Sequence, residues 1–296
     1  MLLVTGITGH TGRYFYEELV NRKYNGVIRC LVRKTTNTSL LNNSPLNIEV
    51  VHGDINNDRS IDDVMKGVEE VIHIYNIHNS ISIVKSAIKH QVKKVVLVHT
   101  TGIYSNFKEA SARYIEIEKE ISQILKTNSN IDVIILRPSM IYGDMCDHNM
   151  SKFIKVIDKF KFMPVIDGGK SLIQPVNARD LGKAYYVALT SLHGQKAYDL
   201  TGDRPITLKD AYKIIASKLN KKIYFINIPL WLGIIVARFI KLVTLDKLNI
   251  VEKVQRMAEN RSYSHAEAKH DFNFSPLTFE EGIHLEVQQY LKKSRG

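Results

Sequence analysis

The chain has 296 residues, 44% of them hydrophobic and 24% charged, a composition that argues for a globular protein with a sizeable core and excludes a disordered chain. Its 41 Lys and Arg residues against 30 Asp and Glu residues give a formal net charge of +11, which favours anionic small molecules as partners. The basic residues are spread along the chain without interleaved aromatic residues, so we predict no nucleic-acid partner.

The cysteine content indicates a reducing compartment. Cys30 and Cys146 are the only two cysteines, too few for a disulfide framework in a chain of this length. Neither has a metal-ligand spacing such as C-x-x-C, so we expect no metal site. An apolar strand begins at Leu2, so we expect no signal peptide and a cytoplasmic location.

The first half of the chain alternates short apolar runs, which predict strands, with amphipathic segments, which predict helices. Strands that are apolar throughout indicate a parallel sheet with helices on both faces. Right-handed crossovers then give a doubly wound arrangement. The second predicted helix begins with Ser60 as its cap. The predicted strands are residues 2–5, 27–32, 48–52, 71–74, 94–99 and 133–136, and the predicted helices are residues 10–21, 60–67, 81–90 and 111–125.

A glycine-rich loop follows the first strand. Residues 4–12 read VTGITGHTG, with glycines three residues apart between a strand and a helix, the context required of a dinucleotide-binding loop. The first glycine permits a tight turn, the second lets the backbone approach a pyrophosphate, and the third lets the helix pack closely. Amide groups at the helix start would face the phosphates. We therefore predict a nicotinamide dinucleotide bound by Gly6, Thr8, Gly9, His10, Thr11 and Gly12.

The end of the second predicted strand indicates which dinucleotide binds. An NAD site usually has Asp or Glu there, whereas this strand ends in LVRKTT. Arg33 lies 21 positions after Gly12, and a guanidinium suits a 2′-phosphate, so we favour NADP(H) over NAD(H). Asp54 and Ile55 follow the third strand and are predicted to contact the adenine, although an Asp at a strand end is also a common helix cap.

The pattern changes after residue 138. Longer loops separate short strands near residues 172–176 and 197–200, and two capping boxes open further helices. We therefore divide the chain into a nucleotide-binding domain, residues 1–138, and a smaller substrate lobe, residues 139–296, partly interleaved with the main sheet. The capping boxes pair Thr207 with Asp210 and Thr278 with Glu281.

One apolar segment needs a membrane interpretation. Residues 229–245 read PLWLGIIVARFIKLVTL, which is shorter than a typical transmembrane span and contains Arg238 and Lys241. A packed helix of the C-terminal lobe is the favoured interpretation. The alternative is an interfacial helix that makes peripheral membrane contact.

Together these motifs resemble the extended or atypical branch of the short-chain dehydrogenase/reductase superfamily, often called the NAD-dependent epimerase/dehydratase family. The resemblance covers nearly the whole chain and implies an α/β fold: a Rossmann-type doubly wound parallel sheet with a smaller C-terminal substrate lobe. It also implies that Pro138 borders the nicotinamide end of the cofactor. The matching segments are residues 5–12 (TGxxGxxG in the family), 53–54, 71–73, 137–143 (RPxxxYG in the family), 174–176, 180–181, 198–202, 271–276 and 280–282.

The resemblance further implies a Tyr general acid/base activated by a Lys four residues later, with a Ser or Thr beside the substrate oxygen. Thr100 and Thr101 are the candidate hydroxyls, and Tyr114 takes the Tyr position. The fourth residue after Tyr114 is Glu118, and a carboxylate raises a neighbouring Tyr pKa. Three interpretations stay open: Tyr114 acts without the Lys, other groups catalyse, or the site binds cofactor without chemistry.

We therefore predict an NAD(P)-dependent oxidoreductase, epimerase or dehydratase acting on a nucleotide sugar or related carbohydrate, which suits the basic charge. Two alternatives come from other classes. The missing Lys favours a non-catalytic NADP(H)-binding regulatory or assembly protein. The segment 229–245 favours a membrane-associated reductase of a lipid or sterol. A homodimer is a further open expectation.

Overall fold

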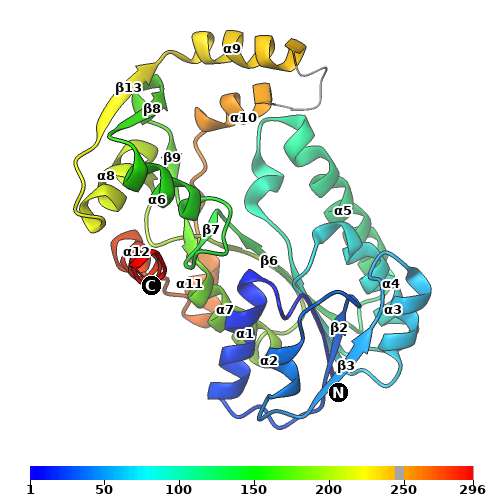
Figure 1. The fold of residues 1–296 in the computed structure, drawn as a ribbon. Coiled ribbons are helices and arrows are strands. Elements are labelled where there is room, and N and C mark those ends of the chain that lie inside the picture. The colour runs from blue at the N-terminus through cyan, green and yellow to red at the C-terminus, as the bar shows by residue number, and fades with distance from the viewer. Residues whose placement is uncertain (244–249, 296) are drawn as a thin grey trace.

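The computed structural model describes residues 1–243 and 250–295. In these residues, seven parallel strands form one sheet in the order β11-β6-β5-β4-β1-β2-β3 (Figure 1). The order reverses at β1, as in the doubly wound arrangement expected from the sequence, so the fold prediction is confirmed. The strands are β1 (Leu2–Thr5), β2 (Ile28–Val32), β3 (Ile48–His52), β4 (Glu70–His73), β5 (Lys94–Val98), β6 (Asp132–Pro138) and β11 (Gln195–Leu200).

Helices cover both faces of this sheet because its strands are apolar on both sides. In β1, Leu2 and Val4 point into one core and Leu3 into the other, as the two-residue period of a strand requires. One face carries α1 (His10–Asn21), α2 (Ser39–Asn42), α7 (Ala178–Ser191) and α11 (Ala266–Phe272), and the other carries α3 (Asp58–Met65), α4 (Ser80–Lys89) and α5 (Lys108–Lys126).

A smaller lobe has a third hydrophobic core. Ile154, Tyr212 and Ile283 meet there from three different helices. The chain leaves this lobe twice, first to add α7 and β11 to the main sheet and later to pack α11 on it. The lobe contains α6 (Met150–Lys159), α8 (Leu208–Lys218) and α12 (Phe279–Arg295), and the strand pairs β7 (Ile141–Tyr142) with β10 (Val176–Asn177), β8 (Phe162–Ile166) with β13 (Tyr224–Ile228), and β9 (Leu172–Ile173) with β12 (Ile206–Thr207).

The predicted helices and strands lie within three residues of the observed bounds, and two of the differences have a clear local cause or consequence. The helix expected to begin at Ser60 is α3, which begins at Asp58, because the Asn57 side chain accepts bonds from the amides of Arg59 and Ser60. The strand expected over residues 172–176 is split into β9 and β10. The capping box at Thr207 is confirmed, since its hydroxyl accepts from the Asp210 amide at 3.0 Å.

The apolar segment 229–245 forms α9 (Leu230–Val243), which lies against α10 (Ile250–Met257) at one end of the molecule (Figure 1). Residues 244 and 245 lie outside the described residues. The helix packs on α10 as expected, through its small residues: Gly233 and Ala237 are buried, whereas the large residues, such as Trp231 and Phe239, are exposed. Among the described residues, none of the helices has the length and apolar character needed to span a bilayer.

Candidate functional site

The glycine loop lies where the strand order reverses, at the carboxyl end of β1. Gly6 has a φ of +82°, and a Cβ on it would lie 2.8 Å from the backbone nitrogen of Tyr75. A Cβ on Gly12 would lie 2.1 Å from the carbonyl oxygen of Gly6, so only glycine lets α1 start this close to the loop. The loop therefore has the shape that a dinucleotide-binding turn requires.

A pocket of about 260 Å³, here called the loop pocket, lies over these glycines. Gly6 and Gly9 form its floor with backbone atoms, as a bound pyrophosphate would need. Arg33 and Thr36 line it from the end of β2, and none of the described residues that line it is Asp or Glu. The full lining is Thr5, Gly6, Thr8, Gly9, Leu31, Val32, Arg33, Thr36, Gly53, Ile55 and Tyr75.

Five predicted cofactor residues lie elsewhere than in this lining: His10, Thr11, Gly12, Asp54 and Pro138. Thr11 is buried at 7% exposure, and Asp54 is exposed with its carboxylate accepting from the Asn56 amide at 2.9 Å. His10 turns toward Asp144, with Nε2 3.1 Å from Oδ1. Burial raises the pKa of Asp144, but His10, the Cys146 amide and Arg13 outweigh it and lower that pKa to about 2.

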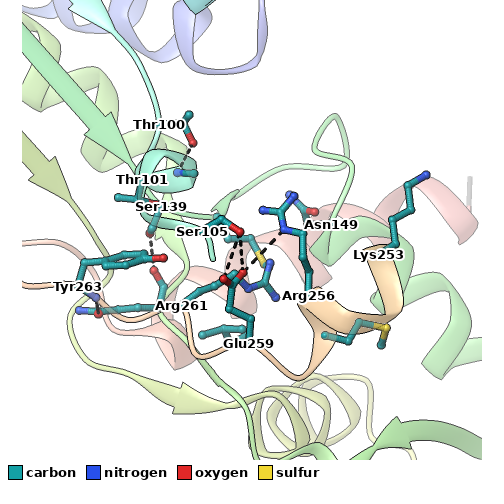
Figure 2. A pocket seen from close by; sticks show the side chains of 15 residues that line it. Thr100, Thr101, Ser105, Ser139, Asn149, Lys253, Arg256, Glu259, Arg261 and Tyr263 are labelled. Carbon is teal, nitrogen blue, oxygen red and sulfur yellow. Dashed lines mark hydrogen bonds and ion pairs between the residues drawn. The ribbon is translucent and has the colours of Figure 1, made fainter. Parts of the chain in front are cut away.

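A second cavity of about 330 Å³, the lobe cavity, opens at the ends of β5 and β6 (Figure 2). Because β4 alone separates β5 from β1 in the sheet, the two pockets lie along the same strand-end edge. Thr100 Oγ1 accepts from the Gly102 amide at 3.0 Å, and Thr101 Oγ1 donates to the Pro138 carbonyl at 3.4 Å. The lining is Thr100, Thr101, Gly102, Ser105, Ser139, Met140, Asn149, Ile173, Gln174, Lys253, Arg256, Met257, Glu259, Arg261 and Tyr263.

Tyr114 does not line the lobe cavity. Its ring packs against His78, with centroids 5.7 Å apart, and against Gly102. Because Gly102 itself lines the cavity, the Tyr114 ring lies on the side of Gly102 that faces away from the cavity. The structure therefore brings Thr100 and Thr101 to the cavity and leaves Tyr114 one residue away.

Glu118, one helical turn after Tyr114, is held in a buried ion-pair network. It accepts from both Nε and the terminal nitrogen of Arg137, and lies 3.0 Å from Nδ1 of His99. Burial raises the pKa of Glu118, but the His99 and Arg137 bonds outweigh it and lower that pKa. Arg137 also donates to the Tyr104 hydroxyl, which in turn donates to Asp199. Neither Arg137 nor Tyr104 was assigned a role from the sequence.

The far wall of the lobe cavity is basic. Lys253, Arg256 and Arg261 line it, and Glu259 supplies the one carboxylate among its described lining residues, leaving a formal charge of +2. The Nε atoms of Arg256 and Arg261 are buried and make no hydrogen bond, although Nε of Arg256 forms an ion pair with Glu259 at 3.9 Å. Burial, and then the charge of Arg256, lower the pKa of Arg261. Buried guanidinium nitrogens that donate no hydrogen bond need an acceptor, which an anionic ligand would provide.

Glu259 fixes this basic wall to the main body. Its carboxylate accepts from the Ser105 hydroxyl and from the Asn106 amide at 2.7 Å (Figure 2). These contacts link residues about 150 positions apart, and no sequence motif marks either partner. The arginines were missed for the same reason. Among the described residues, no three His, Cys, Asp or Glu side chains are grouped to hold a metal.

Comparisons with known proteins agree with this architecture. A family model described as NAD(P)H-binding matches residues 6–159, more than half of the chain. None of the curated proteins compared with the chain matches it.

Solved structures match over the whole chain. The protein gox2253 has a TM-score of 0.78 at 17% identity and covers 100% of this chain and 99% of its own. A UDP-glucose 4-epimerase from Thermotoga maritima, with UDP-glucose, scores 0.75 at 14% identity and covers 99% of each chain. A dTDP-glucose 4,6-dehydratase double mutant from Streptomyces venezuelae, with NAD and DAU bound, scores 0.74 at 16% identity and covers 100% of this chain and 98% of its own. These matches confirm the epimerase/dehydratase resemblance at the level of the fold.

Proposed function

The chain belongs to the NAD(P)H-binding family, and from this premise we propose that it is an NADP(H)-dependent oxidoreductase, epimerase or dehydratase of an anionic carbohydrate such as a nucleotide sugar. In this proposal residues 1–138 hold the cofactor and the lobe from residue 139 onward holds the substrate. The two free cysteines fit a reducing, cytoplasmic setting.

The cofactor assignment rests on the loop pocket. Gly6 and Gly9 place no side chain between the backbone and a diphosphate, and Arg33 takes the place where an NAD site has a carboxylate. A guanidinium there would pair with a 2′-phosphate, so the proposed cofactor is NADP(H). Bound in this pocket, it would supply or accept a hydride at the side facing the lobe cavity.

The substrate assignment rests on one observation: the buried Nε atoms of Arg256 and Arg261 line the lobe cavity, and neither donates a hydrogen bond within the protein. A sugar diphosphate would give both guanidiniums the acceptors they lack, while its sugar reached toward the ends of β5 and β6. The structural neighbours include a UDP-glucose 4-epimerase with UDP-glucose, which supports this class of substrate.

For the proton, we propose Thr100 and Tyr114. The Thr100 oxygen accepts from an amide, so its own O–H can donate to a substrate oxygen, whereas the Thr101 O–H is directed at a carbonyl. Tyr114, behind Gly102, would be the general acid/base without the usual Lys. Tyr114→Phe should then abolish turnover while leaving NADPH affinity unchanged.

One observation favours a non-catalytic alternative. Glu118 stands where the family's Lys would be and is locked by Arg137 and His99. A protein that binds NADP(H) for regulation or assembly would need no activated Tyr. Binding of NADPH without turnover of any sugar tested would support this alternative.

The test is a panel of nucleotide sugars with NADPH or NADP⁺ and product analysis, repeated with Arg256→Gln and Arg261→Gln. Each loses charge-assisted hydrogen bonds of about 1.5–3 kcal/mol, so substrate affinity should fall roughly 10–100-fold. NADPH affinity should stay unchanged. Arg204→Gln is the matched control, because Arg204 is an exposed lobe arginine paired with Glu280. Unchanged substrate affinity in both cavity variants would contradict the substrate assignment.

A further inference from the structure

Helix α9 presents its largest apolar side chains to solvent. It packs on α10 through small residues: Ala237 is buried, and a Cβ on Gly233 would lie 3.1 Å from Cγ1 of Val254. Trp231 is 64% exposed and Phe239 66%. A surface helix of a globular protein normally buries its large apolar residues. In α9 these residues face solvent and the small residues face the protein. The exposed side chains, here called the α9 face, are Trp231, Leu232, Ile235, Val236 and Phe239.

The apolar character continues beside α9. The strand pair β8–β13 ends where α9 begins, and Leu230 donates its amide to Asp167 at 2.8 Å (Figure 1). Tyr224 and Phe162, adjacent in that pair with ring centroids 5.7 Å apart, are more than half exposed. An exposed apolar surface of this extent marks an interaction site.

The charges around the α9 face are positive. Residues 211–245 contain six Lys or Arg and no Asp or Glu. Lys222 and Arg238 are exposed, as are Lys159 at the end of α6 and Lys161 just before β8. Among the described residues, the acidic groups beside the α9 face are Asp158, which pairs with Lys221, Asp167, which accepts from α9, and Glu252 on α10. Asp246 lies outside the described residues. Apolar residues within a basic rim complement an anionic lipid surface.

We propose that the α9 face docks on an anionic bilayer surface. With 14 residues, α9 is about 21 Å long, shorter than the hydrocarbon core of about 30 Å, so it would lie along the interface. Trp231 and Tyr224 are the residue types that settle at that depth. A symmetric contact with a second copy is disfavoured, because it would bring the basic rim against itself.

Docking in this way would place the lobe cavity beside the membrane, since α10 carries Lys253 and Arg256 to the cavity wall. The proposal does not depend on the proposed reaction. It requires only the exposed side chains of α9 and their basic surroundings.

The chain offers a direct probe, because Trp231 is its only tryptophan. We expect the full-length protein to float with vesicles made of equal parts phosphatidylglycerol and phosphatidylcholine. Its tryptophan emission should shift to shorter wavelength. Vesicles of phosphatidylcholine alone should bind at least 10-fold more weakly, and high salt should weaken binding to the anionic vesicles.

The variant Ile235→Ser with Phe239→Ser keeps Trp231 and should lose both flotation and the emission shift. Leu40→Ser is the matched control, because Leu40 is 39% exposed on α2 at the other end of the molecule (Figure 1), and it should bind as the unaltered protein does. Circular dichroism checks that each variant folds. Absence of flotation and emission shift in the unaltered protein would overturn the proposal. So would a dimer in sedimentation equilibrium that the double variant dissociates while vesicles do not bind.

Discussion

Glu118 shows how a single residue can depart from a family pattern without disturbing the fold. The resemblance leads one to expect Lys there, and the sequence alone gives no partner for a carboxylate at that position. In the structure its charge is balanced by Arg137 from the end of β6, and Nδ1 of His99, the residue after β5, lies 3.0 Å from its carboxylate. Position 118 on α5 thus carries a carboxylate bound to a guanidinium from β6, and no ammonium.

Arg137→Met should destabilise the protein strongly, because it leaves the Glu118 carboxylate buried beside a single His. Removing one partner of a buried ion pair typically costs about 3–5 kcal/mol. The double variant Arg137→Met with Glu118→Gln should recover much of that loss. Urea denaturation measures both. If Arg137→Met lowers the unfolding free energy by less than about 1 kcal/mol, the network contributes no more than an exposed ion pair.

The same network should give an acid-sensitive part of the stability. The pKa of Glu118 is lowered from 4.5 in the folded state, so its contribution is present above that value and is lost as pH falls through the folded pKa. The difference in unfolding free energy between the protein and Glu118→Gln should therefore shrink as the pH is lowered below 4.5. A difference that stays constant across that range would show that Glu118 titrates alike in both states.

Arg33 should decide the choice between cofactors. Arg33→Ala would remove the proposed 2′-phosphate contact, a charge-assisted bond of about 1.5–3 kcal/mol, so NADPH affinity should fall roughly 10–100-fold. NADH affinity should hardly change. Lys34→Ala is the control, since Lys34 is also exposed but does not line the loop pocket. Equal losses for both cofactors would contradict the NADP(H) assignment.

At the scale of elements, the sequence predicted local structure well where the signal is itself local. The capping box at Thr207 and the glycine loop each lie within a few residues, and both form as predicted. The start of α3 was missed because Asn57 and Ser60 are both good caps, and the choice between them depends on the path of the chain from β3. The basic cavity wall was missed because Arg256 and Arg261 meet Ser105 only through the tertiary fold.

Asn57→Ala should therefore cost about 0.5–2 kcal/mol of stability, because two amides at the start of α3 lose their acceptor. Ser60→Ala, inside the helix, should be close to neutral. Thermal or urea unfolding of the two variants compares them directly. A larger loss for Ser60→Ala would support the start predicted from the sequence.

At the scale of the molecule, the sheet order and the lobe explain why two pockets share one edge. The sequence shows the apolar runs that form the strands, and the general rule of right-handed crossovers then gives their order in the sheet. The pairing of β11 with β6 was predicted only as a partial interleaving of the lobe with the sheet, because the sequence of a short strand does not identify its distant partner. Only β4 separates the strands whose ends carry the two pockets. The pockets are therefore close enough for a dinucleotide in one to meet a substrate in the other.

Calorimetric titration with NADPH tests the central claim most directly, that the main-chain amides of the glycine loop hold a nicotinamide dinucleotide. The account predicts saturable binding, tighter for NADPH than for NADH. Gly9→Val should weaken it, because the added side chain would stand in the loop pocket. The absence of saturable heat with both reduced and oxidised dinucleotides would contradict the account.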